Sequence, residues 1–560
     1  MDSSRRDWLA AWCAAGLLPQ VAHTAESSPT DLEAAVLKRH DAAVDSNLAK
    51  QNTDPASEYR GAIPDAYGIH WPGTGTGLAN QFAVAFLHPK SKHHHSPQVF
   101  ERLKMAMDYV MRTLSPDGNI FHPQTNFNSP PDTAFAVLAA GEAASIARKH
   151  SNREVEQAIK PFLDRAAGGL TKGGIHTPNH RWVLCSALAI INDLYPDPRF
   201  LKRIDQWLAE GIDIDDDGQY DERSIIGYNI IVDRAFVTLA HKLKRPELLD
   251  PVRKNLDAAF YLMHPGDEMV TEISHRQDRN ARGNIGVYWF PMHYMAIHDR
   301  NPRYAWVAHK YAQQNAGLSA LMDYPELLQP LPTPTEPSTN YHQDFKALEI
   351  SRIRRGHKSA TLMLRGDSRF LQIRSGSAVV EAVRFASAFF GRGQFIPRQW
   401  GRDGDTYTLR QSLSAPYYQP LDPPHRVKAG EWGEVRGERQ RTEMNYLEQW
   451  ATITETEKGF SVSMHATGAV KVPVAIEVAV RGTDGLQLDG LVRAPDVTNG
   501  FLLASGQAVV KAGDRQIRFG PGRALHQYTQ IRGAEAKMPG GCIYITGYTP
   551  FHHTLEFECL

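Results

Sequence analysis

The spacing of the apolar residues changes once along this chain, near residue 322. Before that point, long segments carry apolar side chains at intervals of three and four residues, which is the spacing of one face of an α-helix. After it, short alternating or β-branched runs are bounded by Gly, Asp and Asn, as is typical of strands joined by turns. The sequence therefore predicts an α+β chain of several domains, with helices first and strands second.

The first part of the chain is expected to be all-helical. Its helical segments follow one another in pairs of roughly 45–55 residues, and stacked helical hairpins of that size build solenoids or toroids. Gly73, Gly75 and Gly77 follow no predicted strand, so they indicate a tight turn rather than a dinucleotide loop. The predicted helices are 100–114, 132–149, 179–194, 198–208, 228–243, 247–262 and 285–297.

A proline-rich segment, residues 323–345, lacks any periodic apolar pattern and is expected to be a linker. The short runs beyond it recur about every ten residues, which favours an antiparallel β-sandwich over 346–560. The predicted strands are 360–364, 370–373, 378–385, 450–454, 460–464, 472–480, 501–503, 508–511, 516–519 and 543–546.

The first 28 residues have the order of a Tat-type bacterial export signal. Arg5 and Arg6 precede an apolar stretch from Trp8 to Leu18, and small residues follow. This stretch is shorter than the roughly 20 residues that cross a bilayer, so no membrane span is expected. We therefore expect a periplasmic or secreted protein; the alternative is an ordinary amphipathic first helix.

Charge and cysteine content restrict the partners and the means of stabilisation. The 62 basic and 62 acidic residues give no net charge, so nothing favours nucleic acid and any polyanion must meet a local group of cations. Of four cysteines, one lies in the expected signal, and the remaining three are too few for a disulfide framework. The fold is therefore expected to depend on its cores.

Polar side chains gather where the helix 179–194 is predicted to begin. The Thr-Pro-Asn run there places Asn179 and His180 among free backbone N–H groups at the positive end of the helix dipole, with His176 and Arg181 beside them. An anion would bind favourably at such a place. The alternative is that Asn179 only caps the helix and that His180 is an ordinary surface histidine.

Tyr228 begins a later predicted helix, about one helical hairpin after His180. Equivalent ends of neighbouring inner helices are expected to face one cavity, where a tyrosine and a histidine could transfer protons. A packing role is the alternative for Tyr228.

These features together resemble the heparinase II/III-like polysaccharide lyases, which include certain alginate and heparin lyases. The resemblance lies in the domain order, the Asn179-His180 step, and the segment Asp217-Gly-Gln-Tyr, Glu222-Arg-Ser and Tyr228. It implies an incomplete (α/α) toroid, then an antiparallel β-sandwich, with a uronate polysaccharide in the groove between them. It also implies that Asn179 and His180 neutralise the uronate carboxylate and that Tyr228 is the catalytic tyrosine.

The implied reaction is a β-elimination that leaves a 4,5-unsaturated uronate, and it needs no redox or nucleotide cofactor. Removing the C5 proton places negative charge on the neighbouring carboxylate, so donors such as Asn179 and a protonated or hydrogen-bonding His180 must already be in place. The ordinary pKa of a tyrosine is about 10, so the acid role needs less tuning than the base role. Candidate cations that would assist are Arg181, Arg223 and Arg276.

Further substrate-binding candidates lie elsewhere in the chain. Arg276 and Gln277 lie in a donor-rich turn, Asn128 precedes a helix that Asp132 is expected to cap, and Tyr417 lies in the β part. A solvated turn, a helix cap and a packing residue are the respective alternatives.

Metal sites and other functions stay open. Asp213, Asp215 and Asp217 look like half a calcium loop, but Ser224 stands where a bidentate Glu is needed. A structural zinc is equally unassignable, because the histidine spacing in the β part selects no ligand set. The alternatives to a lyase are a non-catalytic glycan-binding protein and a glycoside hydrolase, whose carboxylate pair would come from Asp132, Asp221, Glu222 and Asp278.

Overall fold

A computed structural model describes residues 29–489, 491–495 and 497–560. The export signal expected over residues 1–28 thus lies outside the described part of the chain. The described chain divides into two compact units. A helical unit comprises residues up to 263 together with 267–337, and a β unit comprises 264–266 and 338–560.

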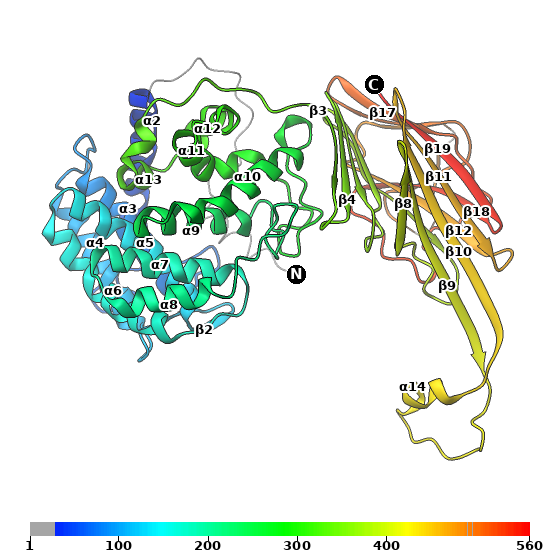
Figure 1. Cartoon of the computed structure of the whole chain (residues 1–560), viewed down its shortest axis with the longest axis horizontal. Coiled ribbons are helices and arrows are strands. Elements are labelled where there is room, and N and C mark those ends of the chain that lie inside the picture. The colour runs from blue at the N-terminus through cyan, green and yellow to red at the C-terminus, as the bar shows by residue number, and fades with distance from the viewer. Residues whose placement is uncertain (1–28, 490, 496) are drawn as a thin grey trace. The chain divides into compact units, whose positions relative to one another are not determined.

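Helices form most of the first unit, as predicted (Figure 1), but the unit is not all-helical, because β1 (Ile120–His122) and β2 (Asn126–Ser129) form a short antiparallel pair before α5. Helices α3, α5, α7, α9 and α11 pack side by side in that order, and α4, α6, α8, α10 and α12 cover them, which is the arrangement of an incomplete (α/α) toroid. The helices are α2 (Pro29–Lys50), α3 (Pro72–Leu87), α4 (Pro97–Thr113), α5 (Pro130–Lys149), α6 (Arg153–Lys172), α7 (Asn179–Leu194), α8 (Pro198–Leu208), α9 (Tyr228–Leu243), α10 (Asp250–Tyr261), α11 (Trp289–His298), α12 (Pro302–Asn315) and α13 (Leu318–Asp323).

Two local expectations in this unit are wrong. Gly73, Gly75 and Gly77 form no tight turn but lie in α3, where a Cβ atom on Gly75 would come within 2.6 Å of Val110 on α4. The glycine thus permits close packing of two helices. Asp132 does not cap α5, because the cap is Ser129, whose Oγ accepts from the Asp132 N–H at 3.2 Å. Prolines occupy the first two helical positions, so Asp132 is the third residue of α5, within its first turn.

The β unit is a sandwich of two sheets (Figure 1). In the part of the chain that the structure describes, one sheet has nine strands in the order β14-β15-β18-β12-β7-β6-β5-β4-β3, and the other has eight in the order β13-β16-β17-β19-β11-β10-β9-β8. Neighbouring strands are antiparallel apart from the parallel pair β15 and β18. The strands are β3 (Asn340–Phe345), β4 (Ile350–Arg355), β5 (Lys358–Met363), β6 (Leu371–Ser375), β7 (Ala378–Ser387), β8 (Gln399–Asp403), β9 (Thr406–Tyr418), β10 (Arg441–Glu455), β11 (Gly459–Gly468), β12 (Pro473–Val480), β13 (Leu486–Leu488), β14 (Leu491–Arg493), β15 (Gly500–Leu503), β16 (Ala508–Ala512), β17 (Arg515–Gly520), β18 (Gly541–Tyr548) and β19 (Phe551–Cys559).

Alternating apolar residues build the core between the sheets. Val462 and Met464 of β11 and Leu555 and Phe557 of β19 point inward, while the residues between them point outward. The proline-rich segment 323–345 includes β3, which pairs with β4 at the edge of the nine-stranded sheet. Cys185, Cys542 and Cys559 are buried free thiols, so no disulfide joins the described residues. Within the described chain, no helix combines the length and hydropathy of a membrane span.

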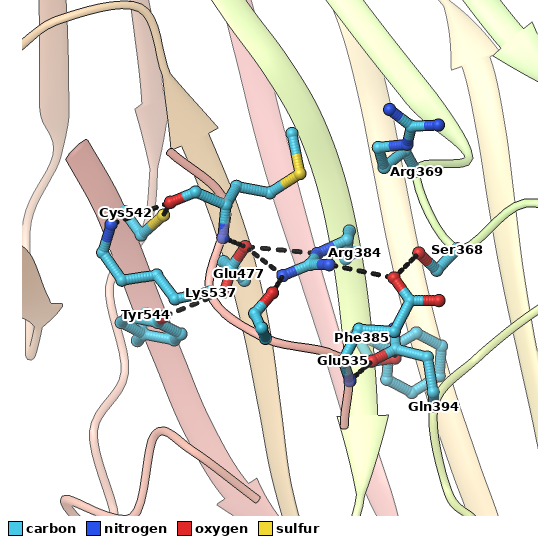
Figure 2. A network of polar contacts seen from close by, with 12 residues as sticks. Ser368, Arg369, Arg384, Phe385, Gln394, Glu477, Glu535, Lys537, Cys542 and Tyr544 are labelled. Atoms are coloured by element: carbon cyan, nitrogen blue, oxygen red, sulfur yellow. Dashed lines mark hydrogen bonds and ion pairs between the residues drawn. The ribbon is translucent and has the colours of Figure 1, made fainter. Parts of the chain in front are cut away.

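The nine-stranded sheet has a buried polar network on its other face (Figure 2). Arg384 of β7 donates to Glu477 Oε1 of β12 at 2.7 Å, and the Tyr544 hydroxyl of β18 donates to Glu477 Oε2 at 2.8 Å. Arg384 also donates to Glu535 at 3.0 Å, in the segment before β18. This network ties the segment to the centre of the sheet, where a lone charge would be costly.

Candidate active site

The start of α7 positions Asn179. Its Nδ2 donates to Glu222 Oε2 at 2.7 Å and makes a longer contact of 3.2 Å with Thr177 Oγ1. Asn179 is buried, and its Oδ1 accepts no hydrogen bond from any described residue. Asn179 is therefore not the helix cap, and it is oriented by a carboxylate from a distant loop.

His180 is a neutral donor rather than an imidazolium. Burial lowers its pKa from 6.5 to about 3, and the charges of His176 and Arg276 act in the same direction. Its Nδ1 lies 2.9 Å from Thr177 Oγ1. If Thr177 accepts from Asn179, its own hydroxyl hydrogen points to Nδ1, and the ring proton is then on Nε2. Thus, of the two expectations for His180, the protonated form is wrong at neutral pH.

Glu222 connects the start of α7 to the turn 271–278. Besides accepting from Asn179, it forms an ion pair with Arg276, whose Nη1 lies 3.3 Å from Glu222 Oε1. Burial raises the pKa of the Glu222 carboxyl, whereas Arg276 and Asn179 act to lower it. From the sequence, Glu222 belongs to the segment that resembles the lyases, and its only expected chemical role is in the hydrolase alternative. Its spacing of three residues from Gln219 and six from Tyr228 gave no signal for this positioning role.

Tyr228 is held at the start of α9 by a serine and an aspartate. The Tyr228 N–H donates to Ser224 Oγ at 2.9 Å, and Ser224 Oγ donates to Asp278 Oδ1 at 2.9 Å. The Arg276 guanidinium lies over the Tyr228 ring, 4.8 Å from its centroid. The Tyr228 hydroxyl makes no hydrogen bond with a residue that the structure describes, although the side chain is only 8% exposed.

The expected meeting of two helix starts is thus present in the structure. A chain of contacts runs from His180 and Thr177 through Asn179, Glu222 and Arg276 to Tyr228. It offers an amide, a neutral imidazole, a guanidinium and a phenol in one partly buried place. Such a set can bind an anion and transfer a proton next to it.

Other candidates lie apart from this chain of contacts. Arg181 forms an ion pair with Asp213 at 2.9 Å and stacks on Trp182. Two residues along a helix are turned by about 200°, so Arg181 points away from the side of Asn179. The His176 ring contacts the His180 ring at 4.7 Å and so lies beside the site.

The remaining candidates have local surroundings of their own. Arg223 lies in a turn with a φ of 49°. Gln277 follows Arg276, and its buried Oε1 accepts no hydrogen bond from the described residues. The Asn128 Oδ1 atom accepts from Ser115 and Asn119, and its Nδ2 atom donates to Asp117. The Asn128 amide is therefore hydrogen-bonded to the neighbouring segment 115–119. Tyr417 is 57% exposed on β9 of the β unit.

The acidic loop before α9 is occupied by protein donors. Asp213 Oδ1 accepts from Trp182 Nε1 at 2.7 Å, and Asp215 Oδ1 accepts from the N–H groups of Asp217 and Gln219. No group of three or more His, Cys, Asp or Glu side chains among the described residues could hold a metal ion. These carboxylates therefore act in building the loop.

No protein-family model matches the chain, and no curated protein matches it. Solved structures do match. The chondroitin AC lyase of Streptomyces coelicolor A3, in complex with chondroitin sulphate, has a TM-score of 0.57 at 14% identity, over 100% of this chain and 82% of that one. A Paenibacillus xanthan lyase has a TM-score of 0.57 at 9% identity, over 100% of this chain and 59% of that one. A heparan sulfate lyase of Pedobacter heparinus has a TM-score of 0.51 at 10% identity, covering 100% and 88%. At these identities the likeness shows a shared fold.

Proposed function

We propose that this chain, which has the fold of chondroitin, xanthan and heparan sulfate lyases, is a polysaccharide lyase acting on a uronic-acid-containing polysaccharide. The observation that carries the proposal is the contact chain from Asn179 through Glu222 and Arg276 to Tyr228. It unites donors for a carboxylate with a phenol whose hydroxyl is free for a ligand.

The uronate carboxylate would be neutralised by neutral donors and one cation. The second Asn179 N–H donates to Thr177 Oγ1 at 3.2 Å, and a carboxylate oxygen of the substrate would replace Thr177 as its acceptor. The Nε2–H of neutral His180 and the Arg276 guanidinium would add to this, because Arg276 lies near enough to affect the pKa of His180. Donors fixed before the reaction stabilise the enolate-like charge as it forms.

The Tyr228 hydroxyl would transfer the proton. The C5 proton passes to the Tyr228 oxygen in its phenolate form, the electron pair of the broken C5–H bond forms the C4–C5 double bond, and the C4–O bond breaks toward the leaving sugar. As an acid, Tyr228 then gives this proton to the leaving oxygen, which returns the phenol to its phenolate form. The Arg276 charge over the ring stabilises the negative charge that the phenol oxygen then acquires. The product carries a 4,5-unsaturated uronate end.

Two of the four carboxylates named for hydrolysis, Asp278 and Glu222, are already bonded to protein donors. Asp278 accepts from Ser224, and also from the Ile226 N–H at 3.1 Å, while Glu222 is tied to Asn179 and Arg276. Hydrolysis needs one carboxyl group free to protonate the leaving oxygen and another free to act on water or on the sugar. Carboxylates already bonded to protein donors are poorly suited to both roles.

One assay separates the three functions. The purified protein is incubated with a panel of uronate polysaccharides while ultraviolet absorbance and reducing ends are followed together. A lyase raises both, because elimination creates a conjugated double bond. New reducing ends without absorbance would show a hydrolase. Binding with neither signal would show a glycan-binding protein, and either result contradicts the proposal.

We also propose that residues 1–28 direct export through the Tat pathway. Support comes from Arg5 and Arg6 ahead of a short apolar stretch. In a bacterial host, Arg5→Lys with Arg6→Lys should retain the protein in the cytoplasm, as measured by cell fractionation. Unchanged export of this variant would contradict the Tat assignment.

A further inference from the structure

The helical unit contains a cavity among its first elements. Its volume is about 570 Å³, within the range of about 300–1,000 Å³ that is usual for ligand pockets. The walls come from the loop 51–71, the end of α4 and the strand β1. None of its lining residues belongs to the chain of contacts from His180 to Tyr228, so the cavity is a separate place. The residues that line it include Glu58, Tyr59, His70, Tyr109 and Phe121.

Hydrogen bonds fix the walls of this cavity. Asp65 Oδ1 accepts from the Ile69 N–H at 2.9 Å, and Asp65 Oδ2 accepts from Gln124, which follows β1, at 3.0 Å. Arg112 Nη2 of α4 donates to the Arg60 carbonyl at 2.8 Å. The loop is thus tied both to α4 and to the turn between β1 and β2. A cavity whose walls are already ordered binds a ligand at a lower entropic cost.

Aromatic rings line this cavity. The rings of Tyr59 and His70 are stacked, with centroids 4.2 Å apart, and Tyr59 is 40% exposed. Phe121 adds a partly exposed ring from β1. A sugar ring has a face of C–H groups, which packs against aromatic rings, and an edge of hydroxyls, which forms hydrogen bonds. The aromatic rings therefore fit the apolar face of a sugar.

Tyr109 provides a polar partner in the cavity. The residue is only 2% exposed, and its hydroxyl makes no hydrogen bond with any residue that the structure describes. Burial is the main cause that raises the pKa of Tyr109 to about 12, so the hydroxyl stays protonated at neutral pH and can donate. A buried polar group without a partner is costly. A sugar hydroxyl in the cavity would supply that partner.

The charge of the lining favours an uncharged sugar. Among the described residues that line the cavity, Glu58 is the only carboxylate, and there is no lysine or arginine. Glu58 lies beside the Tyr59 hydroxyl, since it raises the pKa of Tyr59 mainly through a hydrogen bond. The cation that acts on Tyr109 is Arg112, which donates to the Arg60 carbonyl. A carboxylate accepts hydrogen bonds from sugar hydroxyls, whereas it repels a uronate or a sulfate group.

The cavity lies at the same end of the helical unit as the candidate active site. The Trp71 ring, just before α3, contacts the His122 ring of β1 at 4.8 Å, and the Phe135 ring near the start of α5 contacts the His180 ring at 6.1 Å. Packed helices lie about 8–10 Å apart, so the starts of α3 and α7, with α5 between them, are roughly 16–20 Å apart. A polysaccharide bound at Tyr228 can span this distance with several of its sugars.

We propose that this cavity is a second sugar-binding site, which holds an uncharged sugar of the same polysaccharide whose uronate binds near Tyr228. The rings of Tyr59 and Phe121 pack against the C–H face of the sugar. The Tyr109 hydroxyl donates to the sugar, and Glu58 accepts from its hydroxyls. The substrate thus contains uncharged sugars as well as uronate. The inference rests on the proposed function in taking the ligand to be a polysaccharide.

Binding of free sugars to the full chain tests this site without any turnover. The probes are glucose, mannose, N-acetylglucosamine and N-acetylgalactosamine, titrated by nuclear magnetic resonance. We expect at least one of them to bind with a millimolar dissociation constant. Tyr109→Phe and Tyr59→Ala should each raise that constant about fivefold, as loss of one hydrogen bond or of one packing surface implies. The control Tyr195→Phe removes a hydroxyl elsewhere in the helical unit and should bind the sugar as the wild type does.

Competition by glucuronate tests the role of charge. Glucuronate should not displace the uncharged sugar from the wild type, because Glu58 repels it. In Glu58→Gln, which removes this charge, glucuronate should compete. The control Glu101→Gln removes an exposed carboxylate that does not line the cavity, and it should exclude glucuronate as the wild type does.

Thermal unfolding establishes that each variant is folded. Tyr109→Phe removes a hydroxyl that has no described protein partner, and Tyr59→Ala, at an exposed residue, serves as the test if Tyr109→Phe does not fold. No binding of any of the four sugars, unchanged binding in the folded variants, or displacement by glucuronate from the wild type overturns the proposal. Lyase activity without sugar binding would remove this site alone, whereas sugar binding here without lyase activity would remove only the proposed reaction.

Discussion

The guanidinium of Arg276 lies over the ring of Tyr228, with its Cζ atom 4.8 Å from the ring centroid. The same guanidinium is 3.3 Å from Glu222 Oε1, so its position is fixed by a carboxylate on one side and an aromatic face on the other. Glu222 in turn orients Asn179. Arg276 is therefore the residue through which the proposed proton donor and the proposed carboxylate-binding amide are held together.

The first prediction concerns the phenol. Tyr228→Phe should lower kcat about a thousandfold, the usual range for loss of a general acid or base, while leaving the Kd for substrate nearly unchanged. The Tyr228 ring still packs beneath Arg276, because only the hydroxyl is removed. The rate is followed by ultraviolet absorbance and the affinity by calorimetry.

The matched control is Tyr195→Phe, which removes a hydroxyl that bonds Glu156 elsewhere in the helical unit. Its turnover should equal that of the wild type. Full activity of Tyr228→Phe would remove Tyr228 from the mechanism.

The second prediction separates charge from geometry at Arg276. Arg276→Gln should lower kcat about a hundredfold, because it removes a fixed cation from the place where negative charge develops. Arg276→Lys keeps the charge but loses the planar fork, so its kcat should lie between those of the glutamine variant and the wild type. Equal activities of the two variants would show that charge over Tyr228 is unimportant.

Helix boundaries could be predicted where local signals are strong. The predicted bounds of α7, α8 and α9 agree with the structure, since Asn, Pro or Gly stands at each start and the apolar period is regular. Helix α6 is not among the predicted helices, although its buried side chains, which include Val155, Ile159, Phe162 and Leu163, keep helical spacing. Pro161 and the pair Gly168-Gly169 disfavour a helix interior, and packing against α5 stabilises the helix in spite of them.

The site could be predicted only as far as its helix starts. Asn179, His180 and Tyr228 were placed together from the hairpin repeat, and the structure joins them. The sequence also places Arg181 beside Asn179 and His180, whereas in the structure Arg181 pairs with Asp213. This ion pair depends on the conformation of the loop before α9, which the sequence does not reveal. The outer ends of strands β9 and β10 are not predicted for a related reason: they are polar and lack a core-facing period.

The third prediction tests Thr177 as a positioning residue. Thr177→Val keeps the shape but removes the hydroxyl between Asn179 and His180 Nδ1. We expect kcat to fall about tenfold and the free energy of unfolding to fall by about 1–2 kcal/mol. The structural control is Thr171→Val, whose hydroxyl bonds only Ala167 O of its own helix. If both variants retain the wild-type kcat, the Thr177 hydroxyl between Asn179 and His180 has no role in catalysis.

The fourth prediction follows from burial of His180. Its pKa of about 3 in the folded chain is below the 6.5 of the unfolded chain, so acid favours the unfolded state. The stabilisation that neutral His180 contributes to the folded chain is fully present above pH 6.5 and is lost as the pH falls toward 3. Between pH 7 and pH 5, His180 alone should lower the free energy of unfolding by about 2 kcal/mol.

Urea unfolding of the wild type and His180→Gln at both pH values measures this effect. The variant should lose about 2 kcal/mol less than the wild type over this interval, as the linkage relation requires. His552→Gln, at an exposed histidine, should follow the wild type. A difference between His180→Gln and the wild type that does not change with pH would contradict the assigned neutral, buried state.

The fifth prediction concerns the buried ion pair of the β unit. Arg384 and Glu477 have side chains only 5% and 8% exposed, and Glu477 also accepts from Tyr544 (Figure 2). Glu477→Gln leaves the guanidinium with Glu535, which is half exposed, as its remaining carboxylate. Because an uncompensated buried charge is costly, the free energy of unfolding should fall by about 3 kcal/mol.

The comparison for that variant is an exposed ion pair. Glu101→Gln removes the partner of Lys104 on α4, where both side chains are in water. Exposed pairs contribute little, because solvent screens the charges and ordering the side chains opposes the attraction. Urea unfolding should therefore show no clear change for Glu101→Gln. A change as small for Glu477→Gln would mean that Glu535 alone, or water reaching Arg384, compensates the guanidinium.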